Sequence, residues 1–357
     1  MYDASQIKVL TPLEAIRARP AMYIGRTGTE GLMEMVGGAV SYFLHGHRAG
    51  LTTTIDVSVE GDAADAPVRI RADGSFGELV SQTRLDRTLL ELVFSSPRMG
   101  SDLTGFRGDP ALPDGCVAPL AAVSSELEVE VCDGGDRHRL RGGDAELWGR
   151  PQRVGPSTER SMTIRYRADG GVLGAESYDL DALGRTLATV AALHPDLLVV
   201  FQGQRVGSGR GLAELHTGPL ARPAQPIQAE TFRERVHLRL SLGWRLDERP
   251  PSVRAFSDDD HRNEALVEGF HEGLLEALRA HVRADLPSAD LRGGWGLGLD
   301  AVLHARVPSD VDRWKSTYEP VEPATVRACA RDATHEAVAA RIMSRPLFHA
   351  WLRDVFA

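Results

Sequence analysis

Hydrophobic residues recur along the first part of the chain in two patterns that predict interleaved helices and strands. Thr11, Pro12 and Glu14 form the signature of a capping box at the start of a short helix. Spacings of three and four residues predict helices, and two-residue alternation predicts strands. The predicted helices cover 31–45, 85–94 and 180–193, and the predicted strands cover 53–59, 68–71, 126–132, 137–140, 161–166 and 197–201.

The second half of the chain shows the same two patterns in the order β-β-α-β-α. Its predicted strands cover 236–244, 252–256 and 299–307, and its predicted helices cover 263–284 and 323–341. Residues 205–225 are poor in apolar side chains and rich in Gly and Pro, as is typical of a boundary between domains. We therefore expect an N-terminal arm over 1–10, an α/β domain over 11–210 and a second α/β domain over 211–357.

Composition narrows the classes of function without naming one. The 357 residues are 42% hydrophobic and 25% charged, as expected of a soluble globular protein. A net charge of −9 disfavours strong intrinsic binding to DNA phosphates. No apolar run approaches the ~18 residues of a membrane span, and the N-terminus lacks the apolar core of a secretory signal. Three scattered cysteines predict neither a disulfide framework nor a zinc site, so we expect a cytoplasmic protein without a membrane partner.

One long run gives the sequence a family resemblance. The residues from Ile7 to Gly25 (IKVLTPLEAIRARPAMYIG), continued by Gly31-Leu32-Met33-Glu34-Met35-Val36, resemble the opening of DNA gyrase B and its topoisomerase IV counterpart. Further similar pieces follow in order at 68–71, 89–94, 124–131, 163–166, 256–257, 269–270 and 301–308. The resemblance implies a GHKL (Bergerat) ATP-binding α/β sandwich followed by a ribosomal-S5-like transducer domain.

The positions that carry the family's ATP chemistry hold different residues here. The general-base Glu of the family falls on Gly38, and the Asn that helps to hold Mg²⁺ falls on Tyr42. Glycine cannot accept a proton, and a phenol does not replace an amide ligand. The adenine-binding Asp falls on Ala72 and its supporting Thr on Met162, while Gly74 is the glycine that is clearly kept.

The phosphate-binding lid of the family is also altered. Its glycine-rich segment becomes Leu112-Pro113-Asp114-Gly115-Cys116. Proline lacks an amide donor and aspartate repels phosphate, so this loop is unsuited to an anion. The resemblance, residue by residue, therefore predicts that the protein does not hydrolyse ATP in the gyrase manner and takes no Mg²⁺-ATP as a cofactor.

Three positions keep open alternatives. A shift of one residue in the alignment would place Asp73 at the adenine position. The transducer lysine that contacts the γ-phosphate is Lys315 in one alignment and is lost to Trp314 in another; the chain has only two lysines. Tyr2 matches the tyrosine of the swapped arm through which gyrase-type subunits dimerise, so the resemblance implies a homodimer.

Other polar clusters have simpler explanations. His45 and His47 lie near the lost base and are candidates for acid–base chemistry because of their residue type, although surface histidines are the simpler interpretation. The run 258–261 (DDDH) resembles a metal cluster, but a solvated turn is favoured. The glycine-rich run 205–211 (RVGSGRG) lacks the strand–turn–helix frame of a phosphate loop.

Two functions of different classes, and a third, are consistent with these residues. In the first, the former ATP pocket binds or transforms a more apolar small molecule, with Tyr42, Asp73, His45 and His47 as acid–base candidates. In the second, the protein is a nucleotide-free dimeric scaffold, regulator or decoy of a type II topoisomerase. In the third, a different alignment restores a functional ATPase. Whether the protein is an enzyme stays open at this point.

Overall fold

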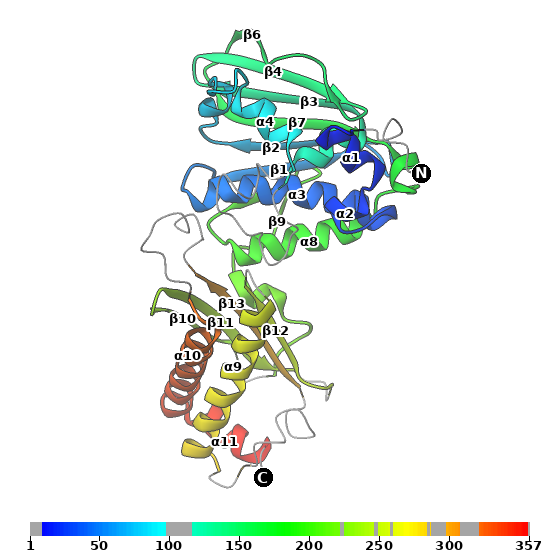
Figure 1. Ribbon diagram of the computed structural model, residues 1–357. Helices are drawn as coiled ribbons and strands as arrows, with labels where there is room; N and C mark the ends of the chain where they lie inside the picture. The colour runs from blue at the N-terminus through cyan, green and yellow to red at the C-terminus, as the bar shows by residue number, and fades with distance from the viewer. Residues whose placement is uncertain are drawn as a thin grey trace, which may run out of the picture. The chain divides into compact units, whose positions relative to one another are not determined.

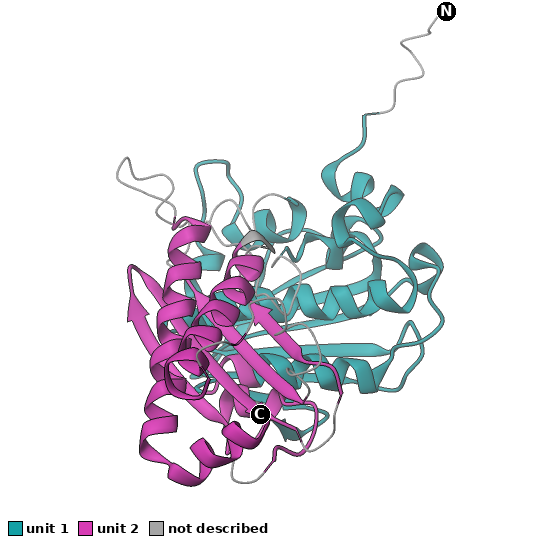
Figure 2. Ribbon diagram, turned by 90° about the horizontal axis from the view of Figure 1, so that it is seen from below, with its two compact units in different colours: residues 1–191, 196–206 teal, residues 192–195, 207–357 magenta. Residues whose placement is uncertain are grey.

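The computed structural model describes the chain in two compact units. It describes residues 9–97, 116–221, 225–245, 249–257, 260–283, 286, 298–307 and 321–355. The first unit ends at Val206, and the second begins at Gly207 and also includes residues 192–195 (Figure 2). The predicted domain boundary between residues 210 and 211 stays a prediction. Over the residues described, no helix is both long enough and apolar enough to cross a membrane.

A mixed sheet organises the first unit (Figure 1). Its described strands lie in the order β5-β4-β3-β7-β2-β1-β8-β9, with β6 beside β4. The pair β1–β8 is parallel, and the other pairs are antiparallel. The bounds are β1 Thr54–Val59, β2 Pro67–Asp73, β3 Ser124–Asp133, β4 Asp136–Gly143, β5 Glu146–Leu147, β6 Gln152–Pro156, β7 Arg160–Ala168, β8 Leu198–Phe201 and β9 Gln204–Val206.

Two of the described helices of the first unit begin at capping boxes. The predicted capping box is present, because Thr11 Oγ1 accepts the Glu14 N–H at 3.2 Å and Glu14 Oε2 accepts the Thr11 N–H at 2.8 Å. The helix expected from residue 85 begins only at Leu89, after a cap at Thr88 and a left-handed residue at Asp86 (φ 54°). The helices are α1 Pro12–Ala18, α2 Ala21–Ile24, α3 Gly28–Arg48, α4 Leu89–Ser95, α6 Ala118–Ala122, α7 Gly170–Leu173 and α8 Leu180–Leu193, with a 3-10 turn over Gly77–Val80.

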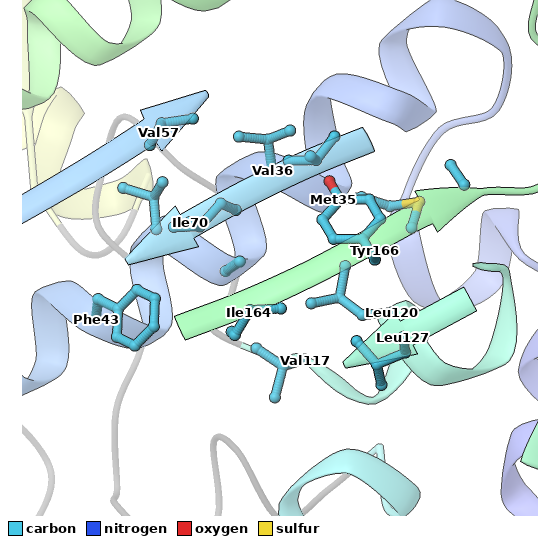
Figure 3. Close-up of a cluster of buried hydrophobic side chains, with 14 of the residues drawn as sticks. Met35, Val36, Phe43, Val57, Ile70, Val117, Leu120, Leu127, Ile164 and Tyr166 are labelled. Carbon is cyan, nitrogen blue, oxygen red and sulfur yellow. The ribbon is translucent and has the colours of Figure 1, made fainter. Parts of the chain in front are cut away.

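The apolar side of α3 forms the centre of the first core. Met35, Val36 and Phe43 project from α3 into the same buried cluster as Ile70 of β2 and Ile164 of β7 (Figure 3). All five side chains are at most 3% exposed. Burial of apolar side chains contributes roughly 1.5–3 kcal/mol each, so this cluster fixes α3 on the sheet.

A four-stranded sheet in the order β10-β11-β13-β12 organises the second unit. Buried Trp244 of β11 packs on Phe348 with the ring centroids 5.9 Å apart. The sequence did not predict β10, which pairs with β11 across a tight turn whose central residues, Glu234 and Arg235, have φ of 47° and 66°. The elements are β10 Ile227–Arg233, β11 Val236–Trp244, β12 Ser252–Phe256, β13 Leu299–Arg306, α9 Asp260–His281, α10 Pro323–Ser344 and α11 Pro346–Val355, with a 3-10 turn over Gly211–Leu215.

Candidate functional site

The candidate site follows one stripe of α3. Glu34, Gly38 and Tyr42 succeed one another at four-residue intervals, so they lie on one face of the helix. The resemblance places the general base at Gly38 and the metal-holding amide at Tyr42. Glu34 was not among the predicted site residues, although its position one turn before Gly38 is a signal that the sequence contains.

A cavity of about 380 Å³ opens beside Gly38. This volume lies within the roughly 300–1,000 Å³ of small-molecule pockets. Among the described residues, Glu34 is the lining residue that carries a formal charge, and most of the other lining side chains are apolar. The cavity is lined by Met22, Tyr23, Ile24 and Gly25 at α2, by Glu34, Met35 and Gly38 on α3, and by Pro97, Cys116, Pro119 and Leu120.

Glu34 is half-buried at this cavity. Burial raises the pKa of its carboxyl above the ordinary value; the Arg26 guanidinium opposes this shift and the charge of Glu30 reinforces it. Arg26 itself pairs with Glu30, with Nη1 and Oε2 2.9 Å apart. Glu34 therefore borders a mainly apolar space, and burial disfavours the charged form of its carboxyl.

The position of the adenine-binding Asp is filled by core side chains. Ala72 of β2 lies between Ile55 of β1 and Met162 of β7 in the register of the sheet. All three side chains are fully buried. At the two positions where the resemblance places a carboxylate and a hydroxyl group, the side chains of Ala72 and Met162 thus offer no hydrogen bond.

Asp73 faces the other side of β2. Successive strand residues point to opposite faces, and the burial of β2 alternates accordingly, with Ala72 buried and Asp73 half-buried. Asp73 Oδ1 accepts the N–H groups of Thr53 and Thr54 at 2.8 and 2.7 Å, and Oδ2 accepts the Thr53 hydroxyl at 2.5 Å. Burial alone would raise the pKa of Asp73, but these hydrogen bonds outweigh it and lower the pKa.

Gly74 brings two backbone segments together. Its φ is +126°, and a Cβ built there would lie 2.4 Å from the Leu51 carbonyl oxygen. Its N–H donates to the Arg160 carbonyl at 3.0 Å. This glycine is therefore required by the close packing of β2 against the loop that follows α3.

The predicted acid–base candidates on α3 differ in their surroundings. Tyr42 is half-buried and packs edge-on against Phe43, and burial raises the pKa of its phenol. Burial, followed by the charge of Arg48, lowers the pKa of His45. His47 Nδ1 donates to the Thr52 carbonyl at 2.9 Å, and Nε2 lies 3.4 Å from Asp196 Oδ2, so His47 links the end of α3 to two loops.

Several predicted positions lie outside the described residues. They are Tyr2 of the arm, Trp314 and Lys315 of the transducer loop, Leu112 to Gly115 of the lid, and Asp258 and Asp259 of the acidic run. Cys116, at the end of the lid, is described and lines the cavity beside Gly38. The acidic run continues into α9, which begins at Asp260.

The glycine-rich run 205–211 binds a carboxylate of this chain. Gly207, Gly209 and Gly211 have positive φ, which turns neighbouring amides toward one point. Glu214 Oε2 accepts the Ser208 N–H, and Oε1 accepts the Arg210 N–H, both at 2.6 Å. Burial raises the pKa of Glu214, but these bonds outweigh it and lower the pKa. The run thus forms a turn closed by an internal anion.

The chain is similar in sequence to DNA gyrase B. It is 26% identical to the gyrase B of Haloferax lucentense over 359 residues, which cover 94% of this chain and 55% of the relative. It is 28% identical to the gyrase B of Streptococcus pneumoniae over 334 residues, which cover 86% of this chain and 50% of the relative. The chain thus spans about half the length of these relatives. No family model matches it.

A solved structure shows the same fold. The 43K ATPase domain of Thermus thermophilus gyrase B, in complex with an aminocoumarin, superimposes with a TM-score of 0.73 at 19% identity and covers 97% of this chain and 94% of the solved chain. The predicted fold class, the α/β fold of the gyrase B 43K ATPase domain, is confirmed. The predicted resemblance to the gyrase B ATPase region is confirmed as well.

Proposed function

We propose that this homologue of the gyrase B ATPase region does not hydrolyse ATP in the gyrase manner, and that its former nucleotide site takes a smaller, less charged molecule. The observation that carries the proposal is the cavity of about 380 Å³ beside Gly38. Where the family has a general base, a residue without a side chain borders a mainly apolar space. Whether the bound molecule is also transformed is left to experiment.

The adenine end of the former site supports the same proposal. Ala72 and Met162 are buried in the core and offer no hydrogen bond to a base. Asp73, which a shift of one residue would bring to this position, points to the other face and is bound by Thr53 and Thr54. A nucleotide there would lose its hydrogen bonds while still requiring desolvation, which costs affinity.

Chemistry at the phosphate end is also impaired. Gly38 has no proton acceptor, and the Tyr42 phenol has a raised pKa, so it stays protonated at neutral pH. Glu34 is one turn away and presents a negative charge to a site that would have to hold phosphates. Repulsion between carboxylate and phosphate is strong in a low-dielectric cavity.

Two assays test this proposal. We expect no phosphate release above the blank from Mg²⁺-ATP and no heat of binding for Mg²⁺-ATP in isothermal titration calorimetry. Turnover, or tight nucleotide binding, would show that the protein is a functional ATPase. Native mass spectrometry of the purified protein then searches for the small molecule that the cavity retains.

A second candidate function is a nucleotide-free dimeric scaffold that docks on a type II topoisomerase in the cytoplasm. It is favoured by exposed apolar side chains at the start of the described chain, where Val9 is 87% and Met22 is 70% exposed. The variant Gly38→Leu separates the two functions because it adds a side chain at the cavity and leaves the exposed Val9 unchanged. Retained binding to a topoisomerase subunit by this variant supports the scaffold, whereas loss of a retained small molecule supports the pocket.

A further inference from the structure

We infer that Glu34 is the polar anchor of the cavity and that its ligand is a compact apolar molecule carrying one amine or another cationic hydrogen-bond donor. The inference rests on the proposed function in one respect, namely that the cavity beside Gly38 is a ligand site. It adds the charge and the chemical class of the ligand.

The position of Glu34 places its carboxyl at the cavity. It lies in the first half of α3, four residues before Gly38 and on the same face. Gly37 and Gly38 each cost the helix about 1 kcal/mol relative to alanine. Gly38 is buried on α3 and lines the cavity together with Glu34.

The charges around Glu34 leave its carboxyl to a ligand. The Arg26 guanidinium, which opposes the raised pKa of Glu34, pairs with Glu30, and both of these side chains are exposed. Within the described residues, Glu34 itself enters no ion pair. Burial already disfavours the charged carboxyl, so a bound cation would restore the stabilisation that burial removes.

The walls of the cavity select the rest of the ligand. Met35 and Leu120, both drawn in Figure 3, contribute to the buried cluster and to the cavity wall. Met22 and Ile24 extend this apolar surface from α2. Such walls favour an apolar body. The carboxyl of Glu34 repels carboxylates and phosphates and attracts a cation, so specificity arises from both attraction and exclusion.

Three matched probes test this assignment: benzylamine, benzyl alcohol and benzoate, which share a ring and differ in charge. Their dissociation constants are measured by ligand-observed NMR titration with the full chain. We expect benzylamine to bind at least tenfold more tightly than benzyl alcohol, and benzoate to bind more weakly than either. The assignment is overturned if benzoate binds as tightly as benzylamine, or if none of the three binds at millimolar concentration.

Two variants test whether Glu34 causes the preference for benzylamine. Glu34→Gln keeps the shape of the side chain and should abolish the preference for the amine while leaving the binding of benzyl alcohol. Asp62→Asn is the control, because Asp62 is an exposed carboxylate of the same unit that does not line the cavity; it should keep the preference. An amine preference that survives Glu34→Gln refutes the inference, and thermal unfolding confirms that both variants fold.

The proposed function fails separately from this inference. Phosphate release or tight Mg²⁺-ATP binding by the wild-type protein refutes the proposed function, whatever the probes do. Binding of benzyl alcohol without any preference for benzylamine leaves the cavity as a ligand site and refutes only the role of Glu34. Gly38→Leu should weaken all probes by at least tenfold, which ties their binding to this cavity.

Discussion

The carboxylate of Asp73 is bound by the backbone of Thr54, whose N–H donates to Oδ1 at 2.7 Å. With the two further hydrogen bonds from Thr53, it joins the end of β2 to the start of β1. The neighbouring Ala72 faces the buried side of the same strand. Asp73, which a shift of one residue in the alignment would place at the adenine position, therefore connects two strands instead.

We predict that Asp73→Asn lowers the free energy of unfolding by about 1–3 kcal/mol, because charged hydrogen bonds are weakened. The pKa of Asp73 is lower in the folded than in the unfolded chain, so its contribution is present above the unfolded pKa and is lost as pH falls through the folded pKa. Urea unfolding over a series of acidic pH values should show a steeper loss for the wild type than for the variant. Asp62→Asn, at an exposed carboxylate, is the control; parallel curves for wild type and Asp73→Asn would contradict the prediction.

Restoring a carboxylate at the adenine position should damage the fold. Ala72 is fully buried and lies opposite Met162, so Ala72→Asp places a carboxyl group in the core with an apolar register partner. We expect a loss of about 3 kcal/mol or more in the free energy of unfolding, and no phosphate release from ATP. Ala72→Ser should lose less. If Ala72→Asp is as stable as the wild type by urea denaturation, the site is open to water and is not part of the core.

Gly74 offers a test of backbone packing with a matched control. Gly74→Ala combines a left-handed backbone with a Cβ 2.4 Å from the Leu51 carbonyl oxygen. Gly149 also has a positive φ, of +96°, but a Cβ there would meet nothing within 4 Å. Gly149→Ala should therefore cost only about 1–2 kcal/mol for the backbone conformation, and Gly74→Ala more. Equal losses in thermal unfolding would show that the contact with Leu51 is relieved easily.

The sequence predicts the fold best where the side-chain period is clean. The helix over 180–193 and the strands over 236–244 and 252–256 have the limits that the structure shows, because each has a clear repeat of apolar positions. The strand β10 was missed because Ile227 is its one fully buried residue and its turn is formed by Glu234 and Arg235 instead of glycine or asparagine. Tight turns built from charged residues leave little sequence signal.

The sequence predicts which residues stand at the positions of the family's ATP chemistry, but it does not predict the cavity beside Gly38. The replacements at Gly38, Tyr42, Ala72 and Met162 follow from the resemblance alone. The cavity does not, because it depends on how α2, α3 and α6 pack, and therefore Glu34 was overlooked. The opposite facings of Ala72 and Asp73 follow from the strand period, once β2 is known to extend to Asp73.

Cys116 should be the first cysteine to react with iodoacetamide. It is partly exposed and lines the cavity, whereas Cys132 and Cys329 are buried, and burial raises the pKa of Cys329. Since the thiolate is the nucleophile, buried thiols react slowly. Peptide mass spectrometry should find one early adduct, absent in Cys116→Ser and slowed by benzylamine. Early modification of Cys132 would mean that the first core opens more readily than the structure indicates.

The final prediction concerns the N-terminal arm, which the family resemblance makes a dimer contact. In that family the bound nucleotide orders the lid and arm, so a protein without nucleotide needs another source of closing energy. Val9 and Leu10, at the start of the described chain, are 87% and 40% exposed. Their burial in a dimer would contribute at about 25 cal/mol per Å², and a ligand that binds only the dimer would add stability by mass action.

We therefore expect a homodimer that ATP analogues do not affect, with Tyr2 inserted into the neighbouring protomer. Deletion of residues 1–10 should shift the protein toward monomer in sedimentation velocity. The double variant Val9→Ser, Leu10→Ser keeps the chain length and should weaken the dimer less than the deletion, because Tyr2 remains. A truncated protein that sediments as the same dimer would show that another surface holds the protomers together, and a dimer that appears only with an ATP analogue would show that the nucleotide site has kept its function.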